Sequence, residues 1–297
     1  MPIVRAYEVD LFYQQDGAPG APPVLLLHGL GCQLTQWPDS FVGGLVAAGF
    51  NVLRMDNRDV GLSGKLDALG SVDVMAMLGA IAQGQVPSPA YTLSQMAGDA
   101  IAVLDALGHQ CAHVIGLSMG GMIAQRVAAD HPQRVLCLTS IMSSSGAAGL
   151  PPPEPAAVAG MLTGMTATTR AEIIAARRQN FDLLGGPHYR SAEVGMGRLS
   201  EAAFDRASHP AGVARQMAAV IADVGRAEAL AKVRAPTLVI HGDVDPLVPL
   251  ACGEDTARRI AGARLMIMPR MGHDLPEPLI PELLDAIVRH LRATPAR

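Results

Sequence analysis

The sequence has few aromatic residues and little charge. Phenylalanine, tryptophan and tyrosine make up 3% of its 297 residues, charged residues make up 17%, and the formal net charge at pH 7 is −4. A weakly acidic chain offers no electrostatic basis for binding nucleic acid or an acidic membrane surface. The hydrophobic content of 49% instead predicts a compact globule with a large buried core.

Targeting segments and metal-site patterns are also lacking. No apolar run approaches the roughly 18 residues that span a bilayer, and the first residues lack the basic and then apolar pattern of a signal peptide. The four cysteines, Cys32, Cys111, Cys137 and Cys252, are scattered without the spacing of a metal site. We therefore expect a soluble, cytoplasmic protein with reduced thiols, no bound metal and no membrane partner.

Apolar runs and helical spacing alternate along most of the chain. The expected strands are Ile3–Val9, Leu11–Tyr13, Val24–Leu27, Asn51–Met55, His113–Gly116, Arg134–Ile141, Pro236–Gly242 and Arg264–Met268. The expected helices are Asp39–Ala48, Thr92–Leu107, Met119–His131 and Pro281–Leu291. This order predicts an α/β fold with a doubly wound, mostly parallel sheet.

The alternation stops after residue 146. Residues 147–223 begin with a proline-rich linker and continue with helical periodicity, without a recognisable strand. We interpret them as a helical cap inserted between a first core part, residues 1–146, and a second core part, residues 224–297. Because loops at the carboxyl ends of parallel strands surround the ligand crevice, the cap is expected to cover the site rather than to lie at the side. Residues 65–90 are expected to form a flap or a short helix near the pocket mouth.

One turn between an apolar strand and a helix has the pattern Gly-x-Ser-x-Gly, as Gly116-Leu117-Ser118-Met119-Gly120. Such a turn holds the serine in a tight backbone conformation and raises its hydroxyl above the end of the sheet. The glycines have no Cβ, so strand and helix approach closely enough for the bend. A purely structural turn is the alternative, but the flanking strand and helix favour Ser118 as a nucleophile.

A second glycine-rich turn, His28-Gly29-Leu30-Gly31, follows an earlier apolar strand. A serine hydrolase stabilises the negative oxygen of its tetrahedral intermediate with preorganised backbone N–H groups. One of these donors comes from a loop of this kind, and the residue after the nucleophile supplies the other. The predicted oxyanion donors are therefore the amides of Leu30 and Met119, with an ordinary strand-to-helix turn as the alternative.

A nucleophilic serine needs a histidine base, and the base needs a carboxylate. Among nine histidines, His273 stands in a Gly-His loop after the last expected strand, where this topology requires a base. His28 and His241 border glycines at strand ends, where structural hydrogen bonding is the expected role. For the acid, Asp243 and Asp245 both follow the preceding strand, and physical reasoning on the residues leaves both plausible.

A charged loop, Asp56-Asn57-Arg58-Asp59, follows the strand Asn51–Met55. Its arginine stands between two carboxylates, which is compatible with a catalytic or a structural role. Because arginine binds carboxylates in a planar, two-point geometry, we interpret Arg58 as a hydrogen-bonded staple of its loop.

Five short motifs are spread over nearly the whole chain. They are His28-Gly29-Leu30-Gly31, Asp56-x-Arg58-x-x-Gly61-x-Ser63, Gly116-Leu117-Ser118-Met119-Gly120-Gly121, Gly242-x-x-Asp245-x-x-x-Pro249 and Gly272-His273. Together they resemble the α/β-hydrolase superfamily, and residues 54–59 with Trp37-Pro38 are most similar to carboxylesterases of the aclacinomycin methylesterase type. The resemblance implies that Asp245 is the acid of a Ser118-His273-Asp245 triad. It also implies ester hydrolysis through an acyl-enzyme, without a metal or organic cofactor. His28 departs from the methylesterase pattern, so an anthracycline substrate is not implied.

The expected partner is a small to medium, mainly apolar ester, because 15 methionines and few aromatic residues predict an adaptable apolar pocket. The residues expected to contact it belong to the oxyanion loop and the stretch after it, to the 65–90 segment and to the cap: Gly29, Gly31, Trp37, Met75 and Met161. The same triad also serves cofactor-free perhydrolysis, as in bacterial haloperoxidases, and C–C bond hydrolysis. A non-catalytic binding protein of this fold is the alternative from another class. No sequence feature predicts an oligomeric state.

Overall fold

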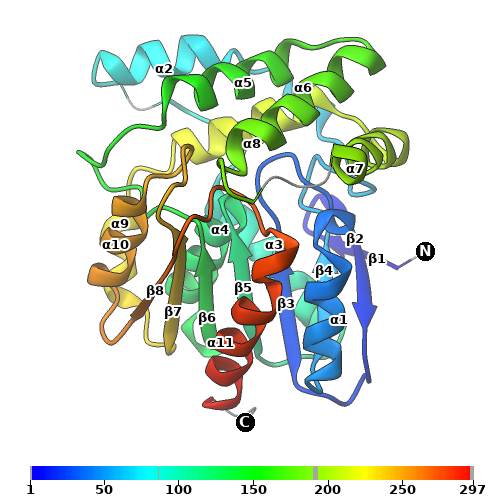
Figure 1. Ribbon diagram of the computed structural model, residues 1–297, viewed down its shortest axis with the longest axis vertical. Coiled ribbons are helices and arrows are strands. Elements are labelled where there is room, and N and C mark those ends of the chain that lie inside the picture. Colours follow the sequence, from blue (N-terminus) through cyan, green and yellow to red (C-terminus); the bar gives the residue numbers. More distant parts are fainter. Residues whose placement is uncertain (1, 86, 190–192, 295–297) are drawn as a thin grey trace.

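A mostly parallel sheet forms the centre of the protein (Figure 1). The computed structural model describes residues 2–85, 87–189 and 193–294. Within them the sheet has the strand order β1-β2-β4-β3-β5-β6-β7-β8. The strands are β1 Ile3–Ala6, β2 Val9–Asp16, β3 Pro23–Leu27, β4 Asn51–Met55, β5 Ala112–Leu117, β6 Val135–Ile141, β7 Thr237–Gly242 and β8 Arg264–Met268. β2 is antiparallel to both of its neighbours, and all other pairs are parallel, which confirms the predicted fold class.

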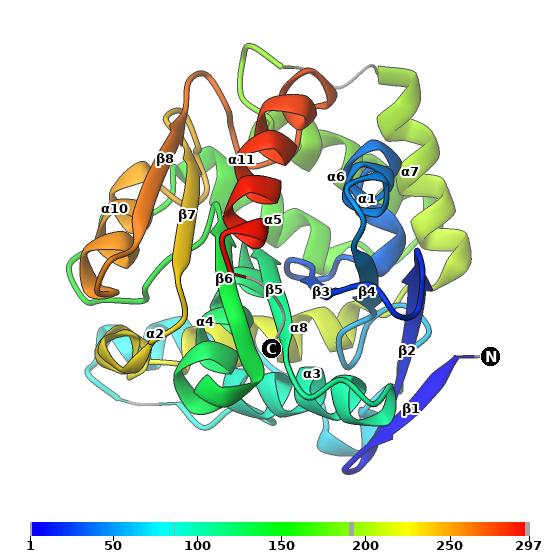
Figure 2. The same cartoon turned by 90° about the horizontal axis from the view of Figure 1, so that it is seen from below.

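Helices cover both faces of this sheet (Figure 2). They are α1 Asp39–Ala47, α2 Val74–Ala82, α3 Leu93–Ala106, α4 Met119–Asp130, α5 Pro155–Thr166, α6 Arg170–Leu184, α7 Glu193–Arg206, α8 Pro210–Ile221, α9 Arg226–Ala229, α10 Leu250–Arg259 and α11 Ile280–Arg292. No helix in the described part of the chain has the length and apolarity to cross a membrane.

Each face of the sheet has its own core, because successive residues of a strand point to opposite sides. In β3, Val24 and Leu26 belong to a core shared with α1 and α11, whereas Leu25 and Leu27 belong to a core shared with α3 and α4. Both sets are fully buried, as the continuous apolar run predicts for a central parallel strand.

The first two strands differ from the sequence-based expectation. β1 ends at Ala6, because Tyr7 adopts a left-handed conformation with φ 51° in the turn that follows. β2 continues beyond the expected Tyr13 to Asp16, because its residues pair with β4 from Tyr13–Met55 to Asp16–Val52. Backbone pairing at a solvated edge does not require apolar side chains, so hydrophobic alternation does not reveal it.

Helices α5–α8 follow β6 in the chain, precede β7, and lie above one end of the sheet together with α2 (Figure 1). This is the end where β3 and β5 finish, because α8 contacts the loop after β3: a Cβ added at Gly31 would lie 3.1 Å from a methyl carbon of Val213. The 65–90 segment contains α2, which packs against α8. The domain boundaries at residues 147 and 223 remain a prediction.

Candidate active site

Ser118 occupies a strained turn between β5 and α4. Its backbone has φ 56° and ψ −122°, a region that few residues other than glycine adopt. The neighbouring backbones are too close for side chains, since a Cβ at Gly116 would lie 2.1 Å from the carbonyl oxygen of Gly120. A Cβ at Gly120 would lie 2.0 Å from the carbonyl oxygen of Leu27. The two glycines therefore permit the bend that leaves the Ser118 side chain partly exposed.

Two short contacts connect Ser118 to a histidine and an aspartate. Nε2 of His273 lies 2.9 Å from Oγ of Ser118, and Nδ1 of the same ring lies 2.7 Å from Oδ2 of Asp245. Oδ1 of Asp245 accepts hydrogen bonds from the amides of Leu247 and Val248, at 2.9 and 2.8 Å. A carboxylate only accepts hydrogen bonds, so Nδ1 carries the imidazole proton and leaves Nε2 free to accept one from the serine.

The geometry separates Asp243 from Asp245, which were both plausible as the carboxylate partner of the histidine. Asp245 is buried and contacts His273. Oδ1 of Asp243 instead accepts a hydrogen bond of 2.6 Å from the amide of Arg270. Of the two carboxylates, the one next to the histidine ring is therefore Asp245.

The loop after β3 lies beside the serine. A Cβ added at Gly29 would lie 3.2 Å from Cβ of Ser118. The Gly29 amide donates to Nδ1 of His28 at 2.7 Å, and burial lowers the pKa of this histidine to about 4, so the ring is neutral and fixes the loop. Within the described residues, the amides of Leu30 and Met119 have no hydrogen-bond acceptor. Both are thus available to an oxyanion.

The remaining predicted contact residues lie on different elements of the structure. Gly31 has φ 66° and packs against α8, and Met161 is half-buried on α5. Met75 is 59% exposed on α2. Trp37 is only 2% exposed, and its ring packs between His28 and Phe41 in the core shared with α1. This burial argues against substrate contact by Trp37, because a side chain enclosed by core residues offers little surface to a ligand.

Arg58 and His241 make the structural hydrogen bonds that the sequence predicts for them. Nε and Nη2 of Arg58 donate to the two carboxylate oxygens of Asp99, at 2.6 and 2.7 Å. This pair is buried and ties the charged loop to α3. His241 is fully buried and its Nε2 donates to the carbonyl oxygen of Val248 at 2.7 Å. Both predictions are confirmed.

Asp274 is a neighbour of the histidine that sequence reasoning did not single out. Its Oδ1 is buried and has no hydrogen-bond partner among the described residues. Burial raises the pKa of Asp274 to about 7, although the charge of His273 acts in the opposite direction. The Gly-His-Asp sequence contains this residue, but only the packing of Gly185 against its carboxylate reveals the burial.

Replacing Asp274 with asparagine is expected to change how stability depends on pH. The folded chain binds this proton more tightly than an unfolded aspartate, whose pKa is about 3.9. The resulting stabilisation is complete below about pH 4 and is lost as the pH rises through about 7. Asp274→Asn should therefore equal the wild type near pH 4 and exceed it by about 4 kcal/mol at pH 8.5, because each of the roughly three pKa units is worth about 1.4 kcal/mol.

Thermal unfolding in a pH series measures this difference. Asp285→Asn, which removes an exposed carboxylate paired with Arg289, is a control expected to give a small difference with no step near neutral pH. A pH-independent effect of Asp274→Asn would contradict the raised pKa.

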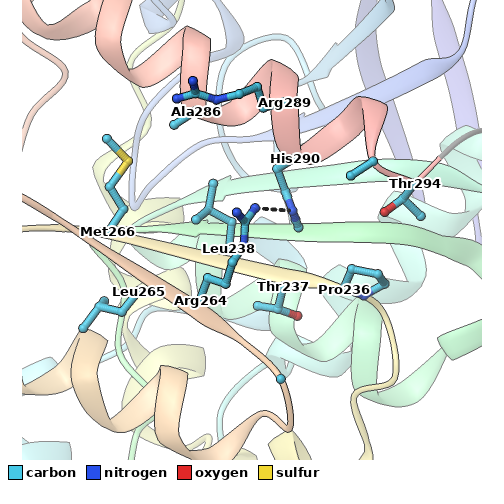
Figure 3. Close-up of a pocket in the computed structure, with 12 residues that line it drawn as sticks. Pro236, Thr237, Leu238, Arg264, Leu265, Met266, Ala286, Arg289, His290 and Thr294 are labelled. Atoms are coloured by element: carbon cyan, nitrogen blue, oxygen red, sulfur yellow. Dashed lines mark hydrogen bonds between the residues drawn. The ribbon is translucent and has the colours of Figure 1, made fainter.

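A cavity of about 510 Å³ lies away from these residues, between β7, β8 and α11 (Figure 3). Its lining includes Thr237 and Arg264, the first residues of β7 and β8. Ser118 follows the last residue of the parallel strand β5, so the cavity and the serine lie at opposite ends of the sheet. Nη2 of Arg264 is 3.3 Å from Nδ1 of His290, whose Nε2 donates to a carbonyl oxygen of β6. The cavity therefore plays no part in the contacts around Ser118.

The chain matches known hydrolases over most of its length. The sequence model of the alpha/beta hydrolase fold family matches residues 22–277. Rhodomycin D methylesterase DnrP of Streptomyces peucetius is 31% identical over 306 residues, which cover 96% of this chain and 96% of that protein. A 2-hydroxy-6-oxononadienedioate/2-hydroxy-6-oxononatrienedioate hydrolase of Cupriavidus pinatubonensis is 29% identical and covers 87% of this chain and 82% of its own. The crystal structure of a hydrolase from Pseudomonas aeruginosa PA01 has a TM-score of 0.70 at 28% identity, over 97% of this chain and 95% of the other.

Proposed function

Since the chain belongs to the alpha/beta hydrolase fold family, we propose that it hydrolyses carboxylic esters with Ser118 as nucleophile, His273 as base and Asp245 as acid. The observation that carries the proposal is the unbroken line of contacts from Oγ of Ser118 to His273, at 2.9 Å, and on to Asp245, at 2.7 Å. The similarity to a methylesterase over nearly the full length supports ester hydrolysis as the reaction.

The first half of the reaction forms an acyl-enzyme. Oγ of Ser118 attacks the ester carbonyl carbon while Nε2 of His273 takes the hydroxyl proton. The amides of Leu30 and Met119 donate hydrogen bonds to the developing oxyanion. The imidazolium is stabilised by Asp245 and gives its proton to the leaving alcohol as the carbonyl re-forms.

The second half reverses these roles with water. His273 takes a proton from a water molecule, whose oxygen attacks the acyl carbon, and the same two amides stabilise the second tetrahedral intermediate. The imidazolium then returns the proton to Oγ of Ser118, and the carboxylic acid leaves. No group outside the chain, the ester and water is required for this balance.

We propose esters of apolar acids with small alcohols as the substrate class. The methylesterase similarity supports a small alcohol. The partly buried Leu30 in the loop after β3 and Val213 of α8 beside that loop support an apolar acyl group. A preference for charged acyl groups would contradict this proposal.

Ester hydrolysis is tested with p-nitrophenyl esters and with methyl esters that vary the acyl and alcohol parts separately. We expect a burst of p-nitrophenol equal to the enzyme concentration, followed by slower turnover, because the acyl-enzyme accumulates. Absence of hydrolysis across the panel, together with no labelling of Ser118 by a fluorophosphonate, would exclude a serine hydrolase of any kind.

Hydrolysis of a C–C bond next to a ketone is the second candidate. One observation favours it: the similar protein from Cupriavidus pinatubonensis carries the name of a hydrolase of a 2-hydroxy-6-oxo dienedioate. A kcat/KM for such a diketone-type substrate at least tenfold above that for the best ester would favour this candidate over the esterase.

A further inference from the structure

Gln216 of the cap helix α8 connects two loops of the core. Its side chain is fully buried. Oε1 accepts a hydrogen bond of 2.9 Å from the amide of Gly31, and Nε2 donates one of 2.8 Å to the carbonyl oxygen of Arg58. Gly31 directly follows Leu30, whose amide is one of the two proposed oxyanion donors. A cap side chain therefore holds the backbone next to a donor group of the core.

The Arg58 end of this bridge is anchored in the core. The guanidinium of Arg58 makes its two-point contact with Asp99 of α3, and it also lies 5.0 Å from the ring centre of Tyr91. The Arg58 carbonyl, which faces α8, is therefore a fixed point. From it, the amide group of Gln216 extends to Gly31.

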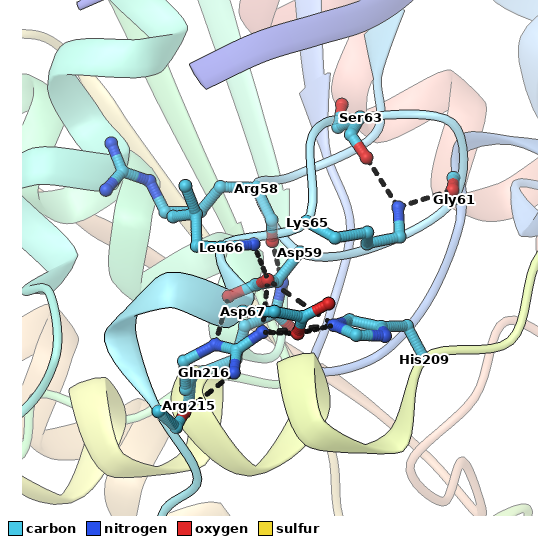
Figure 4. Close-up of polar contacts among 11 residues, drawn as sticks. Arg58, Asp59, Gly61, Ser63, Lys65, Leu66, Asp67, His209, Arg215 and Gln216 are labelled. Atoms are coloured by element: carbon cyan, nitrogen blue, oxygen red, sulfur yellow. Dashed lines mark hydrogen bonds and ion pairs between the residues drawn. The ribbon is translucent and has the colours of Figure 1, made fainter. Parts of the chain in front are cut away.

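The helix that carries Gln216 is itself locked in place (Figure 4). The preceding residue, Arg215, donates to both carboxylate oxygens of Asp59, at 2.8 and 2.7 Å, with both side chains almost completely buried. Burial alone would raise the pKa of Asp59, but hydrogen bonds from Arg215 and from the Leu66 amide hold it below its ordinary value. Gly212 allows α8 to approach the backbone of the charged loop, since a Cβ at Gly212 would lie 2.5 Å from the carbonyl oxygen of Asp59.

A primary amide is the side-chain group that suits this bridge. It offers one acceptor to the Gly31 amide and one donor to the Arg58 carbonyl at the same time. A carboxylate accepts only, and a thioether of similar length leaves both backbone groups without a strong partner. Buried backbone groups that lose their partners drive local rearrangement, and here the rearrangement begins one residue from Leu30.

We propose that Gln216 is a positioning residue for the oxyanion loop, so that the docking of α8 determines whether the Leu30 amide points at the developing oxyanion. This proposal rests on the proposed function, in which Leu30 and Met119 stabilise the tetrahedral intermediate. The loss of Gln216 should therefore impair the transition state and leave ground-state binding of the ester almost unchanged.

The test compares Gln216→Met and Gln216→Glu with the wild-type protein. For Gln216→Met we expect kcat to fall about 10- to 100-fold with KM within about threefold, because a small displacement of one oxyanion donor has effects of this size. For Gln216→Glu, which still accepts from Gly31, we expect a smaller fall of about three- to tenfold. An alkyl boronic acid, which forms a tetrahedral adduct on the serine, should bind Gln216→Met more weakly by the same factor as kcat/KM falls. Binding of the product acid should not change.

Two further glutamines provide controls. Gln179 is exposed on α6, and Gln179→Met should leave kcat unchanged. Gln33 is buried and donates to the carbonyl oxygens of Ala203 and Ala207. Gln33→Met therefore loosens cap contacts without removing the partner of Gly31, and we expect a smaller loss of kcat than for Gln216→Met.

Three results would overturn the proposal. They are an equal loss of kcat in Gln33→Met and Gln216→Met, a change confined to KM, and a boronic acid affinity that does not follow kcat/KM. If Gln216→Met does not unfold cooperatively, Gln216→Glu decides by the second and third criteria, the change in KM and the boronic acid affinity. Failure of the proposed function is distinguishable, because the wild-type protein would then hydrolyse no ester and would not be labelled at Ser118.

Discussion

Replacing Ser118 with alanine is expected to lower kcat for ester hydrolysis by about 10⁴- to 10⁶-fold, as the loss of the nucleophile does in other serine hydrolases. In the proposed mechanism Oγ forms the acyl bond, and its proton leaves along the 2.9 Å contact with Nε2 of His273. The burst of p-nitrophenol should disappear, and the protein should gain no mass from a fluorophosphonate. KM should change little, because the hydroxyl contributes little to ground-state binding.

A matched control is available on the loop after β6. Ser144 is half-buried there, and its hydroxyl accepts a hydrogen bond of 3.0 Å from the amide of Gly146. Ser144→Ala should retain the burst and the labelling. If Ser118→Ala hydrolysed the ester at a rate near that of the wild type, Ser118 would not be the nucleophile, and the carboxylic ester mechanism proposed above would be wrong.

The fold and the positions around Ser118 follow from the sequence because their physical requirements are local. A strained turn requires glycines next to the serine, and the sequence itself shows them as Gly116 and Gly120. The strands Asn51–Met55 and Arg264–Met268 have the bounds that their apolar runs predict. The start of α3 is determined equally locally, since Thr92 is its N-cap residue and the Thr92 side chain accepts a hydrogen bond from the amide of Gln95.

Contacts between distant parts of the chain could not be predicted in this way. Gln216 and Arg58 are separated by 158 positions, and Arg215 and Asp59 by 156. No periodicity or motif relates them, because their pairing depends on how α8 lies over the core. The direction of the Trp37 side chain could not be predicted either. The sequence does not distinguish a tryptophan that faces a substrate from one that packs, as here, in the core shared with α1.

The choice of the acid is an intermediate case. Asp243 and Asp245 both follow β7, and only the course of the loop separates them. Oδ1 of Asp245 caps the amides of Leu247 and Val248, which turns its second oxygen toward His273. That turn depends on hydrogen bonds within four residues, so it is a local feature. The pattern of hydrophobic residues does not predict it, because the bonds involve a polar side chain and backbone amides.

Replacing Asp245 with asparagine is expected to lower kcat by about 10³- to 10⁴-fold, a loss comparable to that of the buried aspartate in other triads. The asparagine keeps the shape of the side chain, but it removes the charge that stabilises the imidazolium. If its NH₂ group faces the ring, Nδ1 of His273 must accept the hydrogen bond, so the proton moves to Nε2 and the base that Ser118 requires is lost.

Asp243→Asn is the matched control, since it makes the same chemical change two residues away. Its partner is the amide of Arg270, which an asparagine oxygen still accepts, so kcat should fall less than about tenfold. Measuring kcat for both variants between about pH 6 and pH 10 adds a second criterion. Because hydroxide replaces the missing base, activity of Asp245→Asn should continue to rise at alkaline pH, where the wild-type profile has levelled off. Equal losses in the two variants would show that the loop as a whole, and not the carboxylate beside His273, sustains catalysis.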